Sequence, residues 1–467
     1  MAAVAWGTPQ GRGIIAAATL GSGLTMLDGS VVNVALRTIG TDLDASLVQL
    51  QWVVNGYFLS LASLILLGGS LGDRFGRRRV FVIGTIWFAA ASLLCGLAPT
   101  AEILIAARVL QGIGGALLTP GSLAMIQGAF ATEDRSRAIG AWSGLGGIAA
   151  AAGPLVGGLL VDHASWRWIF LINLPLAAVT VWLAQRYVPE TRDPGATGRF
   201  DVAGATLASV ALAALTFALT DWHSPIAPWA GAAAVASGVG FWLVERRAHP
   251  PMVPLGLFAD RTFSAANAMT LVVYAALGAI LFFLVLQLQT VAGYTALEAG
   301  LATLPVTAIM LALAARGGEL GQRIGPRIPM SVGPTVMAAG TLWLMVVGPD
   351  VSWWRDVLPG LTVFGLGLAL MVAPLTATVL AAAPDDNAGI ASGINNAVAR
   401  AGSLLAVAAL PVAVGLAGDD YADPTVFDAA YDSAMLVSAA LLLVGGVVSF
   451  LTIPRRLPSD DEVPADR

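Results

Sequence analysis

The sequence predicts an all-helical, polytopic protein that crosses a membrane fourteen times. The chain has 467 residues, of which 57% are hydrophobic and only 11% are charged, and its mean hydropathy is +0.79. Soluble globular proteins carry about 25% charged residues, so this chain lacks the side chains that would solvate it in water. Fourteen spans of about 20 residues would use about 280 residues, close to the apolar share of the chain. A bilayer is therefore the predicted solvent, and a water-soluble enzyme is excluded.

Fourteen apolar runs, each long enough to span a bilayer, follow one another along the chain. The first starts early, is long and holds an acid, so we expect a retained helix rather than a cleaved signal. No gap between runs exceeds about 20 residues, which leaves no room for a soluble domain. Twelve helices is the alternative count. The runs cover residues 14–36, 47–70, 80–98, 103–126, 138–160, 166–186, 203–221, 227–244, 264–289, 297–315, 329–347, 357–382, 392–416 and 434–453.

The arginines support the count of fourteen. All 24 basic residues are arginines, and if both termini are cytoplasmic, 19 of them fall in cytoplasmic segments. Only Arg37, Arg167 and Arg355 fall outside, while Arg108 and Arg400 lie within spans. This bias is what the positive-inside rule predicts for a bacterial inner-membrane protein.

The same bias limits the number of central helices. One helix more or fewer between residues 200 and 264 would reverse the second half and destroy the pattern, so the number is two or none. The runs at 203–221 and 227–244 are both long enough, and we predict two. The acids agree, because one predicted outer loop carries five of them without an arginine: Asp419, Asp420, Asp423, Asp428 and Asp432.

Composition excludes several chemistries. Without lysine the chain has no P-loop lysine and no Schiff-base lysine, so it cannot be its own ATP-driven pump. The single cysteine, Cys95, permits neither a disulfide framework nor a thiolate metal site. His163, His223 and His249 fall in predicted loops, where they do not favour an intramembrane haem. We expect no cofactor, no metal and no nucleic-acid partner for a chain of net charge −5.

The strongest motif is the short loop after the second run, which reads GSLGDRFGRRR over residues 69–79. Its glycines permit tight backbone approach and its acid sits at a helix end. The loop resembles the signature loop of the major facilitator superfamily, and a degenerate copy at residues 318–327 has Gln322 in place of the acid. The resemblance implies two pseudo-symmetric six-helix bundles. It also implies a conformational loop made of Gly69, Asp73, Arg74, Gly76, Arg77 and Arg78.

Further motifs narrow the resemblance to the fourteen-helix drug:proton antiporters of that superfamily. Residues 104–116 carry Arg108 beside glycines on one helix face, like the fourth-helix motif. Residues 27–36 (LDGSVVNVAL) and 166–175 (WRWIFLINLP) resemble that family's first-helix and sixth-helix motifs. Residues 153–158 (GPLVGG) resemble the antiporter motif, although Ala149 replaces its usual first glycine. Its small residues predict close helix packing. The motif residues are Gly153, Pro154, Gly157 and Gly158.

The resemblance implies a domain organisation and a function. We expect a six-helix bundle over residues 1–201, two additional helices over 202–245, and a second bundle with a short cytoplasmic tail over 246–467. The implied activity is proton-coupled antiport that exports lipophilic or weakly cationic drugs and antibiotics by alternating access, in a monomer surrounded by lipid. A dedicated exporter of one self-made metabolite is an alternative, and so is an uncoupled lipid-handling or sensor protein.

Asp28 is the candidate proton carrier, because it is the one acid placed well inside a predicted span. An ionised acid at mid-helix costs about 2.5–3.5 kcal/mol, so such acids are functional candidates, although a structural acid is the alternative. Arg108 is the matching cation or a clamp on carbonyl groups. Arg400, one turn after Asn396, either gives the second half a polar face or is a helix-end arginine that reaches the cytoplasm, and the latter is expected. Asp73 is expected to act as a conformational latch.

The remaining candidates are polar and aromatic residues on helices that line the cavity in this superfamily. Together they predict a large pocket with aromatic walls and few charges, which suits lipophilic compounds. They are Thr25, Asn33, Trp52, Asn55, Tyr57, Gln111, Trp142, Tyr274, Phe282, Gln287, Asn395 and Asn396.

Overall fold

A computed structural model describes residues 4–192, 201–248, 251–384, 387–417 and 420–455. Across these ranges the chain is helical, and the β-structure consists of one isolated bridge between Val4 and Phe130. Five residues used in the sequence analysis lie outside the described residues: His249, Asp419 and three of the arginines counted as cytoplasmic, Arg199, Arg456 and Arg467.

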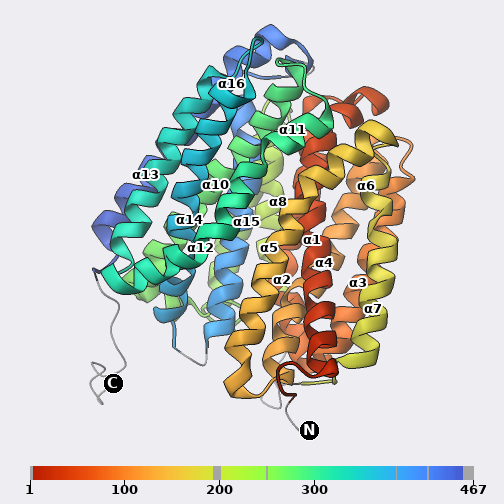
Figure 1. Cartoon of the computed structure of the whole chain (residues 1–467), viewed down its shortest axis with the longest axis vertical. Helices are drawn as coiled ribbons and strands as arrows, with labels where there is room; N and C mark the ends of the chain where they lie inside the picture. The colour runs from red at the N-terminus through yellow and green to blue at the C-terminus, as the bar shows by residue number, and fades with distance from the viewer. Residues whose placement is uncertain (1–3, 193–200, 249–250, 385–386, 418–419, 456–467) are drawn as a thin grey trace.

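The first half of the chain forms a bundle in which α1 packs on α5 and α7, and α4 packs on α2 and α3 (Figure 1). Its sixth crossing is divided into two helices that meet at Ile172. The elements are α1 (Pro9–Leu43), α2 (Leu47–Phe75), α3 (Arg77–Gly96), α4 (Ala101–Ala129), α5 (Thr132–His163), α6 (Trp168–Leu171) and α7 (Asn173–Tyr187).

The second half repeats this plan. Here α10 packs on α15 and α16, while α14 packs on α12 and α13. Short helical turns precede α10, α14 and α16. The elements are η1 (Leu255–Ala259), α10 (Arg261–Thr290), α11 (Ala296–Ala302), α12 (Leu304–Ile324), α13 (Arg327–Trp343), η2 (Leu344–Val346), η3 (Trp353–Val357), α14 (Leu358–Ala381), α15 (Ala388–Ala413), η5 (Asp420–Ala422) and α16 (Pro424–Thr452). Asp428 and Asp432 therefore lie on α16 and not in a loop, which corrects the expectation for these two acids.

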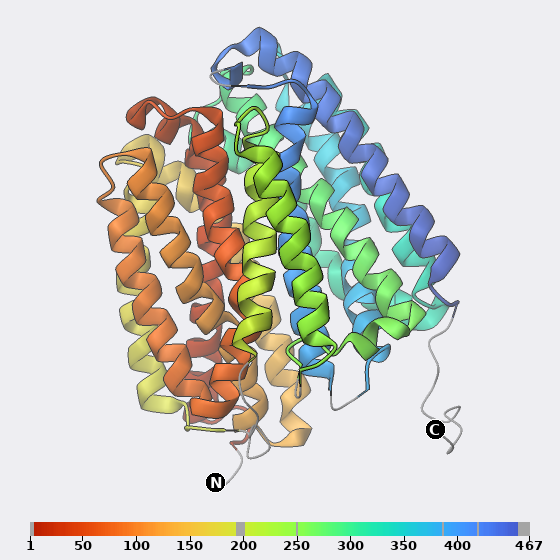
Figure 2. The same ribbon diagram turned by 180° about the vertical axis from the view of Figure 1, so that it is seen from behind.

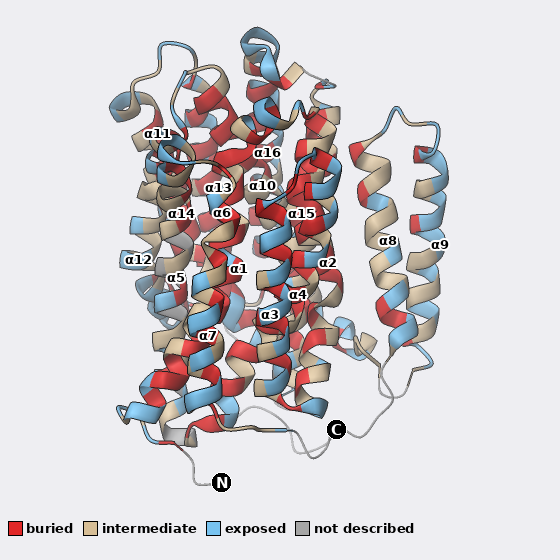
Figure 3. Cartoon of the chain, turned by 90° about the vertical axis from the view of Figure 1, so that its right-hand side faces the viewer, coloured by how far each residue is buried: buried red, intermediate tan, exposed pale blue. Residues whose placement is uncertain are grey.

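Two central helices, α8 (Val202–Thr220) and α9 (Ala227–Glu245), pack on each other, and α8 also contacts α2 and α15. Figure 2 shows this hairpin beside the line where the two halves meet. Figure 3 shows it standing at the side of the main bundle, with few buried residues. Apolar side chains such as Trp229, Val235 and Val239 are exposed on α9. A large exposed apolar surface of this kind fits contact with lipid.

The helix count agrees with fourteen crossings. Thirteen helical segments of the described chain are long and apolar enough to span a membrane. The 32-residue helix α5 is not among those thirteen. It connects the carboxyl end of α4 to the amino end of α6 and therefore supplies one more crossing. At a rise of about 1.5 Å per residue such a helix is long enough for a bilayer. The chain is thus a multi-pass membrane protein.

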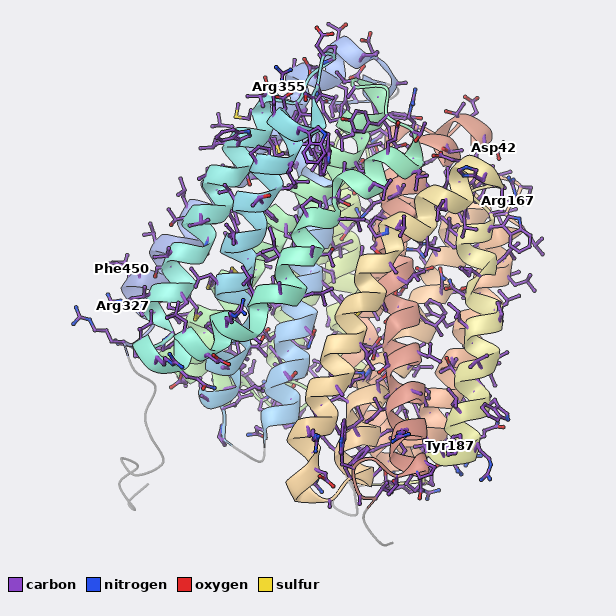
Figure 4. The ribbon with its side chains drawn as sticks, in the orientation of Figure 1. Asp42, Arg167, Tyr187, Arg327, Arg355 and Phe450 are labelled. Atoms are coloured by element: carbon purple, nitrogen blue, oxygen red, sulfur yellow. The ribbon has the colours of Figure 1, made fainter. Side chains whose placement is uncertain are left out.

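The two ends of the molecule differ in charge. The amino end of α1 and the carboxyl end of α16 lie on the same side (Figure 1), which is also the side of the arginine-rich turn between α2 and α3. We call this side the basic end, and the other side the opposite end. At the opposite end, the Arg167 Nη1 atom pairs with the Asp42 Oδ2 atom at 2.8 Å, and Arg355 also lies there (Figure 4).

Candidate functional site

A buried polar network lies in the middle of the first half, around Asp28 of α1. Asp28 and Arg108 of α4 are 0% and 1% exposed, and the Arg108 Nη1 atom donates a charged hydrogen bond to the Asp28 Oδ2 atom. Neither residue would be stable there alone, since an unpaired buried charge is costly. The sequence singled out both residues, and the structure brings them together.

Two amide side chains complete the surroundings of the carboxylate. Nε2 of Gln111 donates to Oδ1 of Asp28 at 2.7 Å, and Nδ2 of Asn173 donates to the same oxygen at 3.2 Å. Both amides also reach the Ser92 hydroxyl, at 2.7 and 3.3 Å. The carboxylate therefore accepts hydrogen bonds from three side chains, and each of its two oxygens has a donor.

The Arg108 guanidinium is held from several directions. Its Nε atom donates to the Val53 carbonyl oxygen at 3.0 Å, and its Nη1 atom also donates to Oε1 of Gln111 at 2.6 Å. Its Cζ atom lies 4.3 Å from the centroid of the Tyr57 ring and 5.6 Å from that of Phe170. Arg108 is therefore both the partner of the acid and a clamp on a carbonyl group, the two alternatives that the sequence left open.

Asn173 and Ser92 were not predicted as members of this network. Asn173 lies in the sixth-helix motif, and Ser92 lies in an otherwise apolar stretch of α3. A polar residue at mid-helix in an apolar run is the signal that could have found Ser92. Its partner could not be read from the chain, because Asn173 is 81 residues away.

The conformational loop at the basic end is held by ion pairs. Arg77 and Asp73, one turn apart, pair at 2.8 Å, and Gly76 separates α2 from α3 with a φ of 114° that favours glycine. Glu190, which sequence reasoning did not single out, accepts a hydrogen bond from the backbone nitrogen of Arg78 at 3.1 Å. Gly69 faces Pro120 of α4, and the guanidinium of Arg74 lies 5.9 Å from the Phe75 ring centroid.

The antiporter motif forms two sets of close contacts, one within the first half and one between the two halves. Gly153 and Gly157 lie against Ser30 and Val31 of α1, inside the first half. A side chain on Gly158 would instead overlap the backbone of Leu297 on α11, which belongs to the second half. The contact between the halves is therefore made at Gly158. Pro154 also takes part in it, because its backbone faces Gly300 of α11.

Hydrogen bonds connect the halves at the opposite end. The two carboxylate oxygens of Asp162 accept from the backbone nitrogens of Ala296 and Leu297, at 3.2 and 2.8 Å. Nε2 of Gln51 donates to the Val407 carbonyl at 2.6 Å, and the Tyr421 hydroxyl donates to the Ala45 carbonyl at 2.8 Å. In this conformation the opposite end is closed.

A cavity of about 300 Å³ also lies between the two halves, where α2, α10, α14 and α15 meet. Its residues on α14 lie near the helix end at the basic end, and those on α15 run from near that end to the middle of the helix. Three of the twelve predicted cavity residues line it: Tyr274, Asn395 and Asn396. The other lining residues are Phe58, Thr376, Val379, Leu380, Ser392, Ala399, Arg400 and Ser403.

The other nine predicted cavity residues are not part of this cavity. Thr25, Asn55, Tyr57, Gln111, Phe282 and Gln287 are buried between helices, the last with its Nε2 atom 2.8 Å from the Val347 carbonyl oxygen. Trp52 packs on Phe217 of α8, Trp142 donates to the Ser22 hydroxyl at 3.1 Å, and Asn33 is half-buried on α1. Helix membership alone does not say which face of a helix turns toward the space between the two halves, so the sequence could not place these nine residues relative to the cavity.

Arg400 was expected to reach out of the bundle toward the cytoplasm. The structure instead places it on the cavity wall, with its Nε atom buried and without a hydrogen-bond acceptor. The expectation of a solvent-facing arginine is therefore wrong in this conformation.

The fold and these sites define a class: a multi-pass helical transporter with two related halves and a cavity between them. A family model described as Major Facilitator Superfamily matches residues 18–407. The chain belongs to the major facilitator superfamily.

Curated relatives are named for resistance and export. The chain is 35% identical to the tetracenomycin C resistance and export protein of Streptomyces glaucescens, over 85% of this chain and 74% of that protein. It is 38% identical to the multidrug resistance protein Stp of Mycobacterium tuberculosis, over 84% of this chain and 73% of the relative. It is 34% identical to the methylenomycin A resistance protein of Streptomyces coelicolor, over 96% and 93%.

Solved structures share the fold at low sequence identity. A D-xylose–proton symporter matches with a TM-score of 0.67 and 15% identity, over 95% of this chain and 98% of the symporter. An inward-facing bacterial homologue of the human lysosomal transporter Spinster matches with a TM-score of 0.66 and 18% identity, over 95% and 97%. These likenesses support the fold alone.

Proposed function

We propose that the protein exports lipophilic, drug-like or antibiotic-like small molecules and couples their export to the entry of protons. The observation that carries this proposal is the fully buried Asp28 carboxylate, held by Arg108, Gln111 and Asn173 in one half of a two-half transporter. The names of the relatives support a drug or antibiotic as the transported compound.

The surroundings of Asp28 suggest how a proton is released. In this conformation three side chains donate hydrogen bonds to the Asp28 carboxylate, and we propose that it is the state reached after the proton has left. Uptake requires another conformation, in which these donors draw back and water reaches the acid. A cycle that alternates between the two conformations carries one proton inward for each molecule exported. The membrane potential then adds about 2.3 kcal/mol per charge per 100 mV to the driving force.

The contacts between the halves support alternating access. Asp162, Gln51 and Tyr421 close the opposite end, while the cavity lies toward the basic end. The arginine bias supports a cytoplasmic basic end, with both termini inside a bacterial inner membrane. We propose that this conformation receives its cargo from the cytoplasmic side. The cavity is formed by a single chain, so a monomer in lipid is sufficient.

Drug susceptibility of cells that produce the protein tests the function. Wild type is expected to raise tolerance to lipophilic compounds, and Asp28→Asn is expected to abolish this protection at equal protein levels. Tolerance to many unrelated compounds identifies a multidrug exporter, and tolerance to one identifies a dedicated exporter. Protection against none would contradict the proposal.

The orientation has a separate test. Reporters fused after residues 195 and 224 should read inside and outside, because α8 lies between these positions. The same reading from both would show that the central hairpin does not span the membrane.

A further inference from the structure

We propose that the cavity between α2, α10, α14 and α15 recognises lipophilic organic anions, and that Arg400 is the residue that selects them. The inference rests on the proposed function for the purpose of the cavity, and it names the class of cargo. It differs from the weakly cationic compounds that the family resemblance suggested.

Arg400 is the one charged side chain among the described residues that line the cavity. Among the described residues it has neither an ion pair nor a hydrogen bond, and its Nε atom is buried without an acceptor. Its electrostatic neighbours are Tyr57 and Tyr274, whose phenols are neutral near pH 7. Arg400 is half-buried, and a partly desolvated cation without a partner is costly, so a ligand can supply the counter-charge that the described lining residues lack.

Three other polar groups of the wall already donate hydrogen bonds within the protein. The Asn395 amide nitrogen donates to Thr270 at 2.7 Å, and the Asn396 amide nitrogen donates to the Ser392 carbonyl at 3.0 Å. The Ser403 hydroxyl donates to the Tyr274 carbonyl at 2.9 Å. The fork of Arg400 thus remains free to bind a carboxylate or an acidic phenol, which matches its planar geometry.

The rest of the wall is suited to an aromatic or aliphatic body. Phe58 and Tyr274 supply aromatic faces, while Val379 and Leu380 supply aliphatic ones. The volume of about 300 Å³ is at the lower end of the range for drug-sized ligands. An acid in the wall would favour cations, but the lining residues that the structure describes include none. The preferred ligand is therefore a compact lipophilic body that carries one acidic group.

Two xanthene dyes of opposite charge test the inference directly: fluorescein, an anion, and rhodamine 123, a cation. Binding to the purified full-length protein is measured by fluorescence polarisation. Wild type is expected to bind fluorescein more tightly. Arg400→Gln should weaken fluorescein binding by about 10- to 100-fold, the range for loss of a charge-assisted hydrogen bond, and leave rhodamine 123 binding unchanged or stronger. Arg400→Lys should retain part of the preference.

A second variant keeps Arg400 in place. Asn396 is exposed and lies one helical turn before Arg400, so Asn396→Asp would add a carboxylate that pairs with the guanidinium. This variant should lose the preference for fluorescein even if Arg400→Gln fails to fold. Arg355→Gln, at the opposite end, is the control for removal of an arginine outside the cavity.

Two results would overturn the inference. One is wild-type protein that binds fluorescein no better than rhodamine 123. The other is an equal loss of both dyes in Arg400→Gln or Asn396→Asp. Binding is measured without a proton gradient, so failure of proton-coupled export leaves this test intact, and failure of this test leaves proton coupling intact.

Discussion

The two halves of the molecule share a helical plan but treat buried charge in opposite ways. In the first half, Arg108 is paired with Asp28 inside a closed network of hydrogen bonds. In the second half, Arg400 faces a cavity whose described lining residues include no acid. A paired charge inside the bundle suits a site that exchanges a proton, whereas an unpaired charge on a cavity wall suits a site that exchanges a ligand. The two halves therefore share a helical plan but place an arginine in surroundings that suit different tasks.

The two copies of the loop motif also differ in whether an arginine is paired with an acid. In the first copy Asp73 pairs with Arg77, while in the second copy Gln322 stands where the acid would be. Arg327 of the second copy lies over the Phe450 ring instead, 4.5 Å from its centroid (Figure 4). The second loop is therefore held by a cation–π contact and lacks the ion pair of the first.

The largest effect is expected when the paired charge is broken. Arg108→Gln leaves the Asp28 carboxylate buried without its cation, which should cost about 3–5 kcal/mol of stability. The melting temperature of the purified variant, compared with that of wild type, measures the loss. Asp28→Asn combined with Arg108→Gln should recover most of the loss.

Arg167→Gln is the matched control for that experiment. Its pair with Asp42 is exposed, so its loss should cost about 0–1 kcal/mol. Equal losses for the two arginines would show that burial does not distinguish them.

An intermediate effect is expected where the halves touch. Gly158→Leu forces a side chain into the backbone of Leu297, and overpacking of this kind costs about 1–3 kcal/mol. The variant should insert normally but fail to close the opposite end, so dye export should be lost. Gly140→Leu, on the same helix with open space around it, should export as wild type does.

Gly157→Leu tests the face of α5 that packs on α1, for comparison with the face that packs on α11. Its side chain would meet Val31 of the same half, so it should lower stability more than it shifts closure. If Gly158→Leu exported normally, α5 and α11 would not be a moving interface.

The smallest effect is expected at Asp162. Asp162→Asn keeps the shape but removes the charge that accepts hydrogen bonds from Ala296 and Leu297, a loss of about 1 kcal/mol. The closed state should become less populated, as seen in distances between spin labels across the opposite end. An unchanged distance distribution would mean that Gln51 and Tyr421 hold the closure without it.

The sequence predicted the fold well because a bilayer imposes simple rules on length, hydropathy and arginine placement. It also identified Asp28 and Arg108, since charges within an apolar run stand out. It missed Asn173 and Glu190, whose roles depend on partners far away in the chain. It misplaced Arg400 because packing between the two halves decides which face of α15 turns toward the cavity.

The central claim is that Asp28 carries the proton, and transport in proteoliposomes tests it most directly. Wild type and Asp28→Asn are compared under an imposed pH gradient, using the dye that the purified protein binds, with Asp42→Asn as a surface control. We predict that Asp28→Asn still binds the dye and performs counterflow but loses gradient-driven transport, while Asp42→Asn keeps it. Undiminished gradient-driven transport by Asp28→Asn would contradict the account.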